Sequence, residues 1–168
     1  ISPGDEIIVP TWTMSACATS ILVWNAIPVF ADISYETYNL DPIDVEKKIT
    51  KKTKAIMAVD IFGHSAPIKE LKKIAKKYNL KIISDSAQSP GAKYGKNYAG
   101  TLTDIGGISL NYHKHINTGE GGVIFTNSKN YAQRMQLIRN HAESVVANKK
   151  VKNLQNLIGY NFRMGEIE

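Results

Sequence analysis

Residues 53–85 read TKAIMAVDIFGHSAPIKELKKIAKKYNLKIISD, and this stretch decides the fold. Its two ends, AIMAVDIF and KIIS, are almost continuously apolar, as are strands that a sheet buries on both faces. Between them, apolar residues recur three or four positions apart over 67–78, which gives an amphipathic helix one apolar face. A strand, a helix and a second strand in this order predict a parallel α/β unit.

The same alternation continues along the chain. Strands are predicted at 6–10, 29–33, 55–62, 81–86, 105–111 and 122–127. Helices are predicted at 15–25, from Pro42 after an Asp41 cap, at 67–78, and after Ser128. We therefore expect a three-layer αβα fold, in which helices cover both faces of a mostly parallel sheet.

Composition narrows the class of protein. The 168 residues are 43% hydrophobic and 21% charged, which fits one globular domain with a buried core. The net charge is +6, but much of the excess comes from lysines at 47–54 and 69–77, in or beside amphipathic helix patterns. Such charge is typical of a solvated helix face. Aromatic residues are not interleaved with these lysines, so we expect no nucleic-acid partner.

The chain shows no pattern typical of secretion or membrane insertion. Cys17 is its single cysteine, so no internal disulfide can form. There is no signal peptide and no apolar run long enough to span a bilayer, so we expect a cytoplasmic protein without a membrane partner. The sequence opens on Ile1 and stops at Glu168 inside a helix-like pattern, and we expect both ends to be cut.

Ligands on α/β sheets bind at the carboxyl ends of the strands, and this rule points to residues 60–64, 85–88 and 109–114. Asp85 ends the run KIIS, and a carboxylate there is costly unless a cation or strong donors face it. It could equally cap the turn before SPG. Lys114 lies in NYHKHINTGEGG (111–122), where a solvated loop, a metal or anion site, and a reactive amine are the alternatives.

The neighbours of Lys114 favour the reactive amine. His113 and His115 flank it, and like charge or burial makes an amine more nucleophilic. The GEGG run lets the backbone pass close to a ligand. A metal site is disfavoured, because the chain has neither CxxC nor HExxH and two of its histidines straddle a lysine. The histidines considered as ligands are His64, His113, His115 and His141.

Together, Asp85, Gln88 and Lys114 suit pyridoxal 5′-phosphate (PLP). This cofactor needs a lysine that bonds to its aldehyde carbon. It also needs a carboxylate that keeps its pyridine nitrogen protonated, so that the ring can accept electrons.

The chain resembles the sugar aminotransferases of the DegT/DnrJ/EryC1/StrS family, which are PLP-dependent enzymes of the aspartate aminotransferase fold (fold type I). The resemblance rests on ordered motifs along nearly the whole chain. They are GDEIIVPTWTMSACATSILVWNAIPVFADI (4–33), YNLDPIDVEKKIT (38–50), TKAIMAVDIFG (53–63), ISDSAQSPGA (83–92), GISLNYHKHINTGEGGVIFTN (107–127), IRNHA (138–142) and GYNFRMGEIE (159–168). Their order is far more specific than any one motif.

The resemblance implies a role for each residue of the lysine and acid motifs. Lys114 would be the family's lysine that bonds covalently to PLP. Asp85 would pair with the pyridinium nitrogen, and Gln88 would face the phenolic oxygen of the cofactor. Ser109, at the start of the lysine motif, would help to hold the phosphate.

Other positions depart from the family pattern or lie further away. Met14 stands where the family usually has an aromatic residue that stacks on the ring, and a thioether can also pack on a ring face, with Trp12 as the alternative. The usual SF of the lysine motif is SL here. In GYNFRM, Asn161 would reach the phosphate in the neighbouring subunit of a homodimer with shared active sites. Arg163 would shape that site or contact substrate.

The resemblance also implies an activity. We expect transamination of a nucleotide-linked keto-sugar, with glutamate as amino donor by family analogy, for surface polysaccharide or glycan biosynthesis. Residues 1–168 would be part of the PLP-binding large domain, without the upstream phosphate-binding segment and the small C-terminal domain. The alternatives are a PLP-dependent sugar dehydratase of the same family and a truncated, non-catalytic domain that dimerises or binds sugar nucleotide. In the family's 3-dehydratases histidine replaces the lysine, whereas Lys114 keeps the lysine position, five residues before Gly119.

Overall fold

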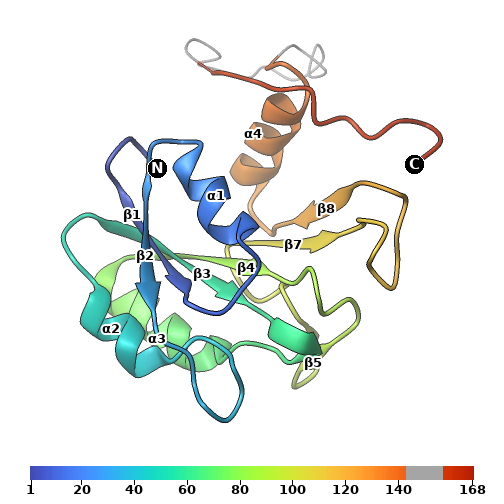
Figure 1. Ribbon diagram of the computed structural model, residues 1–168. Helices are drawn as coiled ribbons and strands as arrows, with labels where there is room; N and C mark the ends of the chain where they lie inside the picture. The colour runs from blue at the N-terminus through green and yellow to red at the C-terminus, as the bar shows by residue number, and fades with distance from the viewer. Residues whose placement is uncertain (143–156) are drawn as a thin grey trace.

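A computed structural model of the chain (Figure 1) describes residues 1–142 and 157–168. Within these residues, the centre is a six-stranded sheet with the order β2-β1-β3-β4-β7-β8. Its strands are β1 (Glu6–Pro10), β2 (Ile27–Ala31), β3 (Thr53–Val59), β4 (Lys81–Asp85), β7 (Ile105–Ser109) and β8 (Gly122–Phe125). The first five in this order pair in parallel, and β8 runs antiparallel to β7. The predicted mostly parallel sheet is confirmed.

Helices cover both faces of this sheet. They are α1 (Ala16–Leu22), α2 (Pro42–Lys48), α3 (Ile68–Tyr78) and α4 (Lys129–Arg139). The helices α2 and α3 pack on one face around Ile8 and Ile56, whereas α1 packs on the other around Ile7 and Val9. Successive residues of β1 therefore point to opposite faces and both sets are buried, which confirms the three-layer architecture.

The helix starts and stops follow local chemistry. The Asp41 carboxylate accepts a hydrogen bond from Ile43 N at 2.9 Å, with Pro42 at the first helical position of α2. The Ser128 hydroxyl accepts one from Tyr131 N and caps α4. At the end of α3, Asn79 adopts a left-handed conformation (φ 55°) that asparagine tolerates well. Both predicted caps are confirmed.

Strand β3 ends three residues before its predicted limit. The apolar run extends to Phe62, yet the strand ends at Val59 and the chain turns through the 3₁₀ segment η1 (Ile61–Gly63). The Asp60 side chain explains the turn, because its buried carboxylate accepts a hydrogen bond from Ala66 N at 2.8 Å. A bond of this kind directs the backbone away from the sheet.

The other differences amount to one to three residues at the ends of elements. The second strand lies two residues earlier than the predicted 29–33, and α1 is shorter at both ends than the predicted 15–25. The strands that begin at Lys81, Ile105 and Gly122 end one or two residues before their predicted limits. A short hairpin of β5 (Lys93–Tyr94) and β6 (Asn97–Tyr98) was not predicted, because each strand has only two residues.

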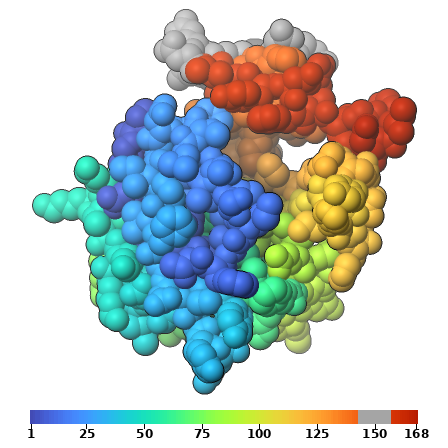
Figure 2. Space-filling view, viewed as in Figure 1, coloured from blue at the N-terminus to red at the C-terminus, as the bar shows by residue number. Residues whose placement is uncertain are grey.

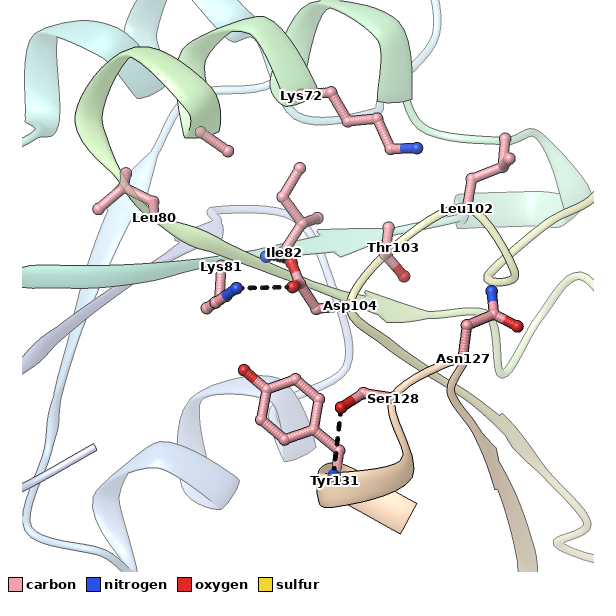
Figure 3. Close-up of a pocket in the computed structure, with 11 residues that line it drawn as sticks. Lys72, Leu80, Lys81, Ile82, Leu102, Thr103, Asp104, Asn127, Ser128 and Tyr131 are labelled. Carbon is pink, nitrogen blue, oxygen red and sulfur yellow. Dashed lines mark hydrogen bonds and ion pairs between the residues drawn. The ribbon is translucent and has the colours of Figure 1, made fainter.

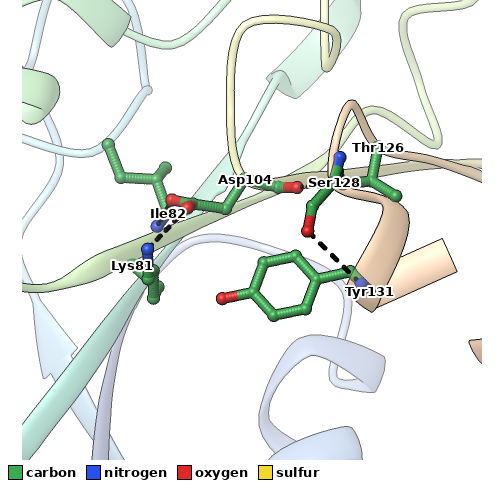
Figure 4. Close-up of polar contacts among 6 residues, drawn as sticks. All are labelled: Lys81, Ile82, Asp104, Thr126, Ser128 and Tyr131. Carbon is green, nitrogen blue, oxygen red and sulfur yellow. Dashed lines mark hydrogen bonds and ion pairs between the residues drawn. The ribbon is translucent and has the colours of Figure 1, made fainter. Parts of the chain in front are cut away.

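Polar contacts tie the sheet together at the amino ends of β4 and β7 (Figure 4). The Asp104 carboxylate accepts hydrogen bonds from Ile82 N at 2.9 Å and from Lys81 Nζ at 3.1 Å. The Thr126 hydroxyl donates to the backbone oxygen of Asp104 at 2.6 Å and accepts from Ser128 N. These contacts connect the start of β4 and β7 with the end of β8 and the start of α4.

Candidate active site

The carboxyl ends of β3, β4 and β7 meet at one edge of the sheet, where the sequence predicted a ligand site. Asp85, the last residue of β4, pairs with Gly107 of β7, so Ser109 lies two residues further along the adjacent strand. The loop with Lys114 leaves from the end of the same strand. The structure thus brings Asp85, Gln88, Ser109 and the lysine loop to one edge.

Asp85 is partly buried and bonded by neutral donors. Its Oδ1 atom accepts a hydrogen bond from Ala87 N at 3.0 Å, and its Oδ2 atom accepts one from the thiol of Cys17 at 3.1 Å. The ion pairs found among the described residues, Lys77–Glu46 and Lys81–Asp104, lie elsewhere. The negative charge of Asp85 is therefore solvated by dipoles and remains available to a cation.

Cys17 is a site residue that the sequence did not reveal. Its side chain lies on α1, is 2% exposed, and lies 3.2 Å from the hydroxyl oxygen of Thr13. Burial, followed by the charge of Asp85, raises the pKa of the thiol to about 12. The thiol is therefore protonated at neutral pH. A contact between residues 68 positions apart has no local sequence signal.

Asp60 is a second carboxylate at this edge. It lies in the stretch 60–64 to which the strand-end rule pointed, although no role was predicted for it. It is fully buried, and its Oδ2 atom accepts a hydrogen bond from the Ser86 hydroxyl at 2.5 Å. Burial raises its pKa above the usual range, although the hydrogen bonds from Ser86 and Ala66 oppose this shift. Asp60 follows an apolar run as Asp85 does, and that signal placed it at this edge.

Gln88 is held by the loop after β3. Its Oε1 atom accepts a hydrogen bond from Phe62 N at 2.9 Å. This contact turns the amide so that its NH₂ group points away from Phe62 and can donate to another acceptor. Phe62 itself has a left-handed backbone (φ 53°), which residues other than glycine rarely adopt.

Lys114 lies in a hydrogen-bonded loop between β7 and β8. Leu110 N donates to Gly121 O at 2.8 Å and closes the loop at its base. Lys114 N donates to Asn111 O at 2.8 Å, which makes a turn at the lysine. The Lys114 side chain is partly buried, whereas both flanking histidines are exposed. The Ser109 hydroxyl accepts from Asn111 N at 3.2 Å and so supports the same turn.

Met14 lies in the turn that leads from β1 into α1. Its backbone oxygen accepts a hydrogen bond from Cys17 N at 3.1 Å, so the Met14 backbone lies next to the residue that contacts Asp85. Its side chain is 67% exposed, and that of Trp12 is 54% exposed. Both side chains are therefore accessible, and the choice between them as the ring-stacking residue stays open.

Asn161 and Arg163 lie apart from these residues, in the C-terminal segment. Arg163 Nε donates to Asn161 Oδ1 at 3.0 Å, and Asn161 forms an isolated β-bridge with Asn140 after α4. The Met164 sulfur approaches the Thr118 hydroxyl at 3.9 Å, so this segment reaches the lysine loop. Figure 2 shows the surface hollowed between the red C-terminal segment and the gold lysine loop.

A pocket of about 480 Å³ lies at the opposite, amino edge of the sheet (Figure 3). Lys81, Asp104 and Tyr131 line it together with apolar residues such as Leu80 and Leu102. None of the predicted site residues lines it, and two of its charged residues, Lys81 and Asp104, already pair with each other. This pocket is separate from the candidate site.

Two further properties follow from the described residues. Residues 1–142 and 157–168 contain no group of three or more His, Cys, Asp or Glu side chains placed to hold a metal ion. No helix in that part of the chain is long and apolar enough to cross a membrane.

The sequence of residues 1–168 matches the profile of the DegT/DnrJ/EryC1/StrS aminotransferase family. The chain belongs to this family. It is 40% identical over 167 residues to a GDP-perosamine synthase of Escherichia coli O157:H7, covering 99% of this chain and 45% of that protein. It is 41% identical over 169 residues to a dTDP-3-amino-3,6-dideoxy-alpha-D-galactopyranose transaminase of Aneurinibacillus thermoaerophilus, covering 100% of this chain and 45% of that protein. The chain thus spans less than half the length of these relatives.

The fold agrees with family membership. An aminotransferase from Psychrobacter cryohalolentis superposes with a TM-score of 0.93 at 33% identity, over 99% of this chain and 44% of that one. The three-layer αβα fold of this chain is therefore the fold of the PLP-dependent aminotransferases, as predicted.

The residues at the carboxyl edge fit PLP, the cofactor that the family implies. Asp85 presents a charge that only neutral donors meet among the described residues, which suits a cationic ring nitrogen. The Gln88 amide nitrogen and the Ser109 hydroxyl hydrogen have no acceptor within 1–142 or 157–168, so both can donate to cofactor oxygens. Lys114 supplies a partly buried amine.

Proposed function

We propose that this chain is the PLP-binding part of an aminotransferase for a nucleotide-linked keto-sugar, which acts in the cytoplasm. Its product would be an amino sugar for surface polysaccharide or glycan biosynthesis. The observation that carries the proposal is that an acid and the loop with a lysine lie at one edge of the sheet. Strand β4 ends at Asp85, and the adjacent β7 leads into the loop of Lys114. The names of the two relatives above support the sugar-nucleotide class.

Lys114 and Asp85 would carry the chemistry. When bound, PLP supplies an electron sink for amino-group transfer. Lys114 Nζ would hold the cofactor until the amino donor, here glutamate, displaces it. The freed amine would then move the Cα proton of the donor to the cofactor carbon, and it would move a proton in the opposite direction when the keto-sugar takes up the amino group. Proton transfer by a positioned side chain contributes about 10²–10⁴-fold. The fixed charge of Asp85 would stabilise positive charge on the ring nitrogen throughout.

The remaining residues would bind and orient the cofactor. Gln88 would donate from its amide nitrogen to the phenolic oxygen, and Ser109 would donate to the phosphate. Met14 would pack on the ring face from the turn before α1.

Asn161 and Arg163 would act across a homodimer. They lie in the C-terminal segment, which reaches the lysine loop at Met164, and their side chains bond to each other. Asn161 would reach the phosphate bound by a second copy of the chain, and Arg163 would contact the sugar-nucleotide substrate.

Cofactor trapping tests the proposal. The protein would be mixed with PLP, reduced with borohydride, digested and analysed by mass spectrometry. We expect the cofactor mass on Lys114, and loss of both the mass and the absorbance of lysine-bound cofactor in Lys114→Ala. The exposed Lys96 provides the matched control, because Lys96→Ala should retain both signals. Cofactor on another lysine, or none in the wild-type chain, would overturn the assignment.

Product analysis tests the reaction class. The full reading frame that contains this chain would be incubated with glutamate and a 4-keto-6-deoxy sugar nucleotide. An amino sugar, formed together with 2-oxoglutarate, is the expected product. A deoxy sugar released without transfer of nitrogen would instead identify a dehydratase.

A further inference from the structure

We propose that Cys17 is a positioning residue that orients the Asp85 carboxylate by donating a hydrogen bond from its thiol. The inference rests on the proposed function only in assigning Asp85 to the cofactor ring. The contact itself is a property of the chain.

The geometry fixes both oxygens of the carboxylate from different elements. The thiol on α1 lies 3.1 Å from Oδ2, and Ala87 N, in the turn after β4, lies 3.0 Å from Oδ1. A carboxylate that accepts one bond at each oxygen cannot rotate about its Cβ–Cγ bond without losing both. The helix and the strand-end turn therefore set the plane in which Asp85 meets a ligand.

The direction of these hydrogen bonds follows from which of the groups carries a hydrogen. Burial and the neighbouring Asp85 charge hold the pKa of Cys17 at about 12, so the sulfur keeps its single hydrogen at neutral pH. The carboxylate can only accept, so that hydrogen points to Oδ2. The Thr13 hydroxyl, 3.2 Å from the sulfur, is then the donor of the other contact. Thr13 and Cys17 are therefore successive donors in a chain of hydrogen bonds that ends at the Asp85 carboxylate.

A thiol suits this position because it is neutral. A lysine or arginine at the same place would cancel the charge of Asp85, whereas two weak neutral donors leave that charge available. The only other buried acid described at this edge, Asp60, lies at the end of the adjacent strand and bonds to Ser86 and Ala66 instead. Cys17 is thus the one side chain within the described residues that holds Asp85.

Thiol reactivity without cofactor tests the contact itself. The rate of alkylation of Cys17 by iodoacetamide would be measured at mildly alkaline pH in the full chain. We expect Asp85→Asn to increase the rate severalfold, because removal of the adjacent negative charge lowers the pKa of the thiol. Glu36→Gln, which removes an exposed carboxylate, is the control and should leave the rate unchanged. An equal rate in the wild type and Asp85→Asn would overturn the contact.

Cofactor affinity tests the positioning role. Cys17→Ala removes the donor, Cys17→Ser keeps a donor of similar size, and Thr19→Ala changes an exposed residue of the same helix. We expect the dissociation constant for PLP to rise about tenfold in Cys17→Ala and to stay close to wild type in the other two. Equal weakening in Cys17→Ser and Cys17→Ala would show that the sulfur only fills space, and the proposal would be wrong.

The two measurements separate failure of this inference from failure of the proposed function. If the wild-type chain takes up no PLP, the proposed function fails. The alkylation rates then still show whether Cys17 donates to Asp85.

Discussion

The hydroxyl of Ser86 donates to the carboxylate of Asp60 at 2.5 Å, immediately after the strand-end acid Asp85. The same carboxylate accepts from Ala66 N at 2.8 Å. Asp60 thereby fastens the turn after β4 to the loop after β3. The position of Asp85 at the sheet edge depends on this buried link as well as on the strand itself.

The link should give stability a distinctive pH dependence. Burial raises the pKa of Asp60, so the folded chain keeps this proton to higher pH than the unfolded chain does. The stabilisation is complete below the usual aspartate pKa of 3.8 and is lost as pH rises through the raised value. Urea unfolding of wild type and Asp60→Asn would be compared between about pH 4 and pH 7.

We expect the wild type to lose stability relative to Asp60→Asn as the pH increases across that window. Glu36→Gln is the control. Because this acid is exposed, the difference in stability between the wild type and Glu36→Gln should not show the same change as the pH increases. A difference between wild type and Asp60→Asn that is constant with pH would contradict the assignment.

Two adjacent glycines in β7 should respond very differently to alanine. A Cβ atom on Gly106 would clash with Gly100 O and would lie 2.5 Å from the Phe125 ring, whereas one on Gly107 would lie 3.6 Å from Val123 O. Gly106→Ala should lower the free energy of unfolding by about 3 kcal/mol or abolish folding, because the contact is with backbone that cannot move aside. Gly107→Ala should change it by less than about 1 kcal/mol. Chemical denaturation compares the two, and similar losses in both would be inconsistent with the packing.

Asp104 makes both a hydrogen bond to a backbone N–H group and a surface ion pair, and two variants can compare what each contributes to stability. Asp104→Ala removes the acceptor of Ile82 N and should lower the free energy of unfolding by about 1–2 kcal/mol. Lys81→Ala removes only the ion pair, in which the lysine side chain is 59% exposed, and should cost less than about 0.5 kcal/mol. Urea unfolding of both variants is the measurement, and a larger loss for Lys81→Ala would show that the pair dominates.

Gln88 has two separate parts: its amide oxygen accepts from Phe62 N, and its amide nitrogen is the proposed donor to the cofactor. Gln88→Glu keeps an oxygen for Phe62 N, and Gln88→Leu removes it. We expect Gln88→Glu to unfold with nearly wild-type free energy and Gln88→Leu to lose about 1 kcal/mol, while both bind PLP more weakly. Denaturation and cofactor titration are measured side by side. Full cofactor affinity in Gln88→Leu would exclude the donor role.

The sequence predicted the parts of the fold that local pattern controls. The apolar runs around 53–85 predicted β3, α3 and β4, and the Asp41 and Ser128 caps were confirmed because capping is a local hydrogen bond. The end of β3 was predicted too late, since the apolar Ile61 and Phe62 continue the pattern. A buried side chain, Asp60, ends the strand through a contact that the pattern does not contain.

The candidate site was predicted in the same uneven way. The strand-end rule located Asp85 and the lysine loop, because parallel strands place their carboxyl ends together. It gave no information about Cys17, whose contact joins a helix to a strand 68 residues away. The roles of all the predicted site residues stay predictions, and those of Met14, Asn161 and Arg163 depend on a bound ring or on a second chain.

The antiparallel strand β8 has a practical consequence for handling this chain by itself. It is the last strand of the described sheet, its sequence is GVIF, and Val123 and Ile124 are 43% and 60% exposed. An apolar terminal strand with free backbone groups is a template for aggregation. Ile124→Lys should therefore reduce light scattering of concentrated samples, and unchanged scattering would mean that precipitation starts elsewhere.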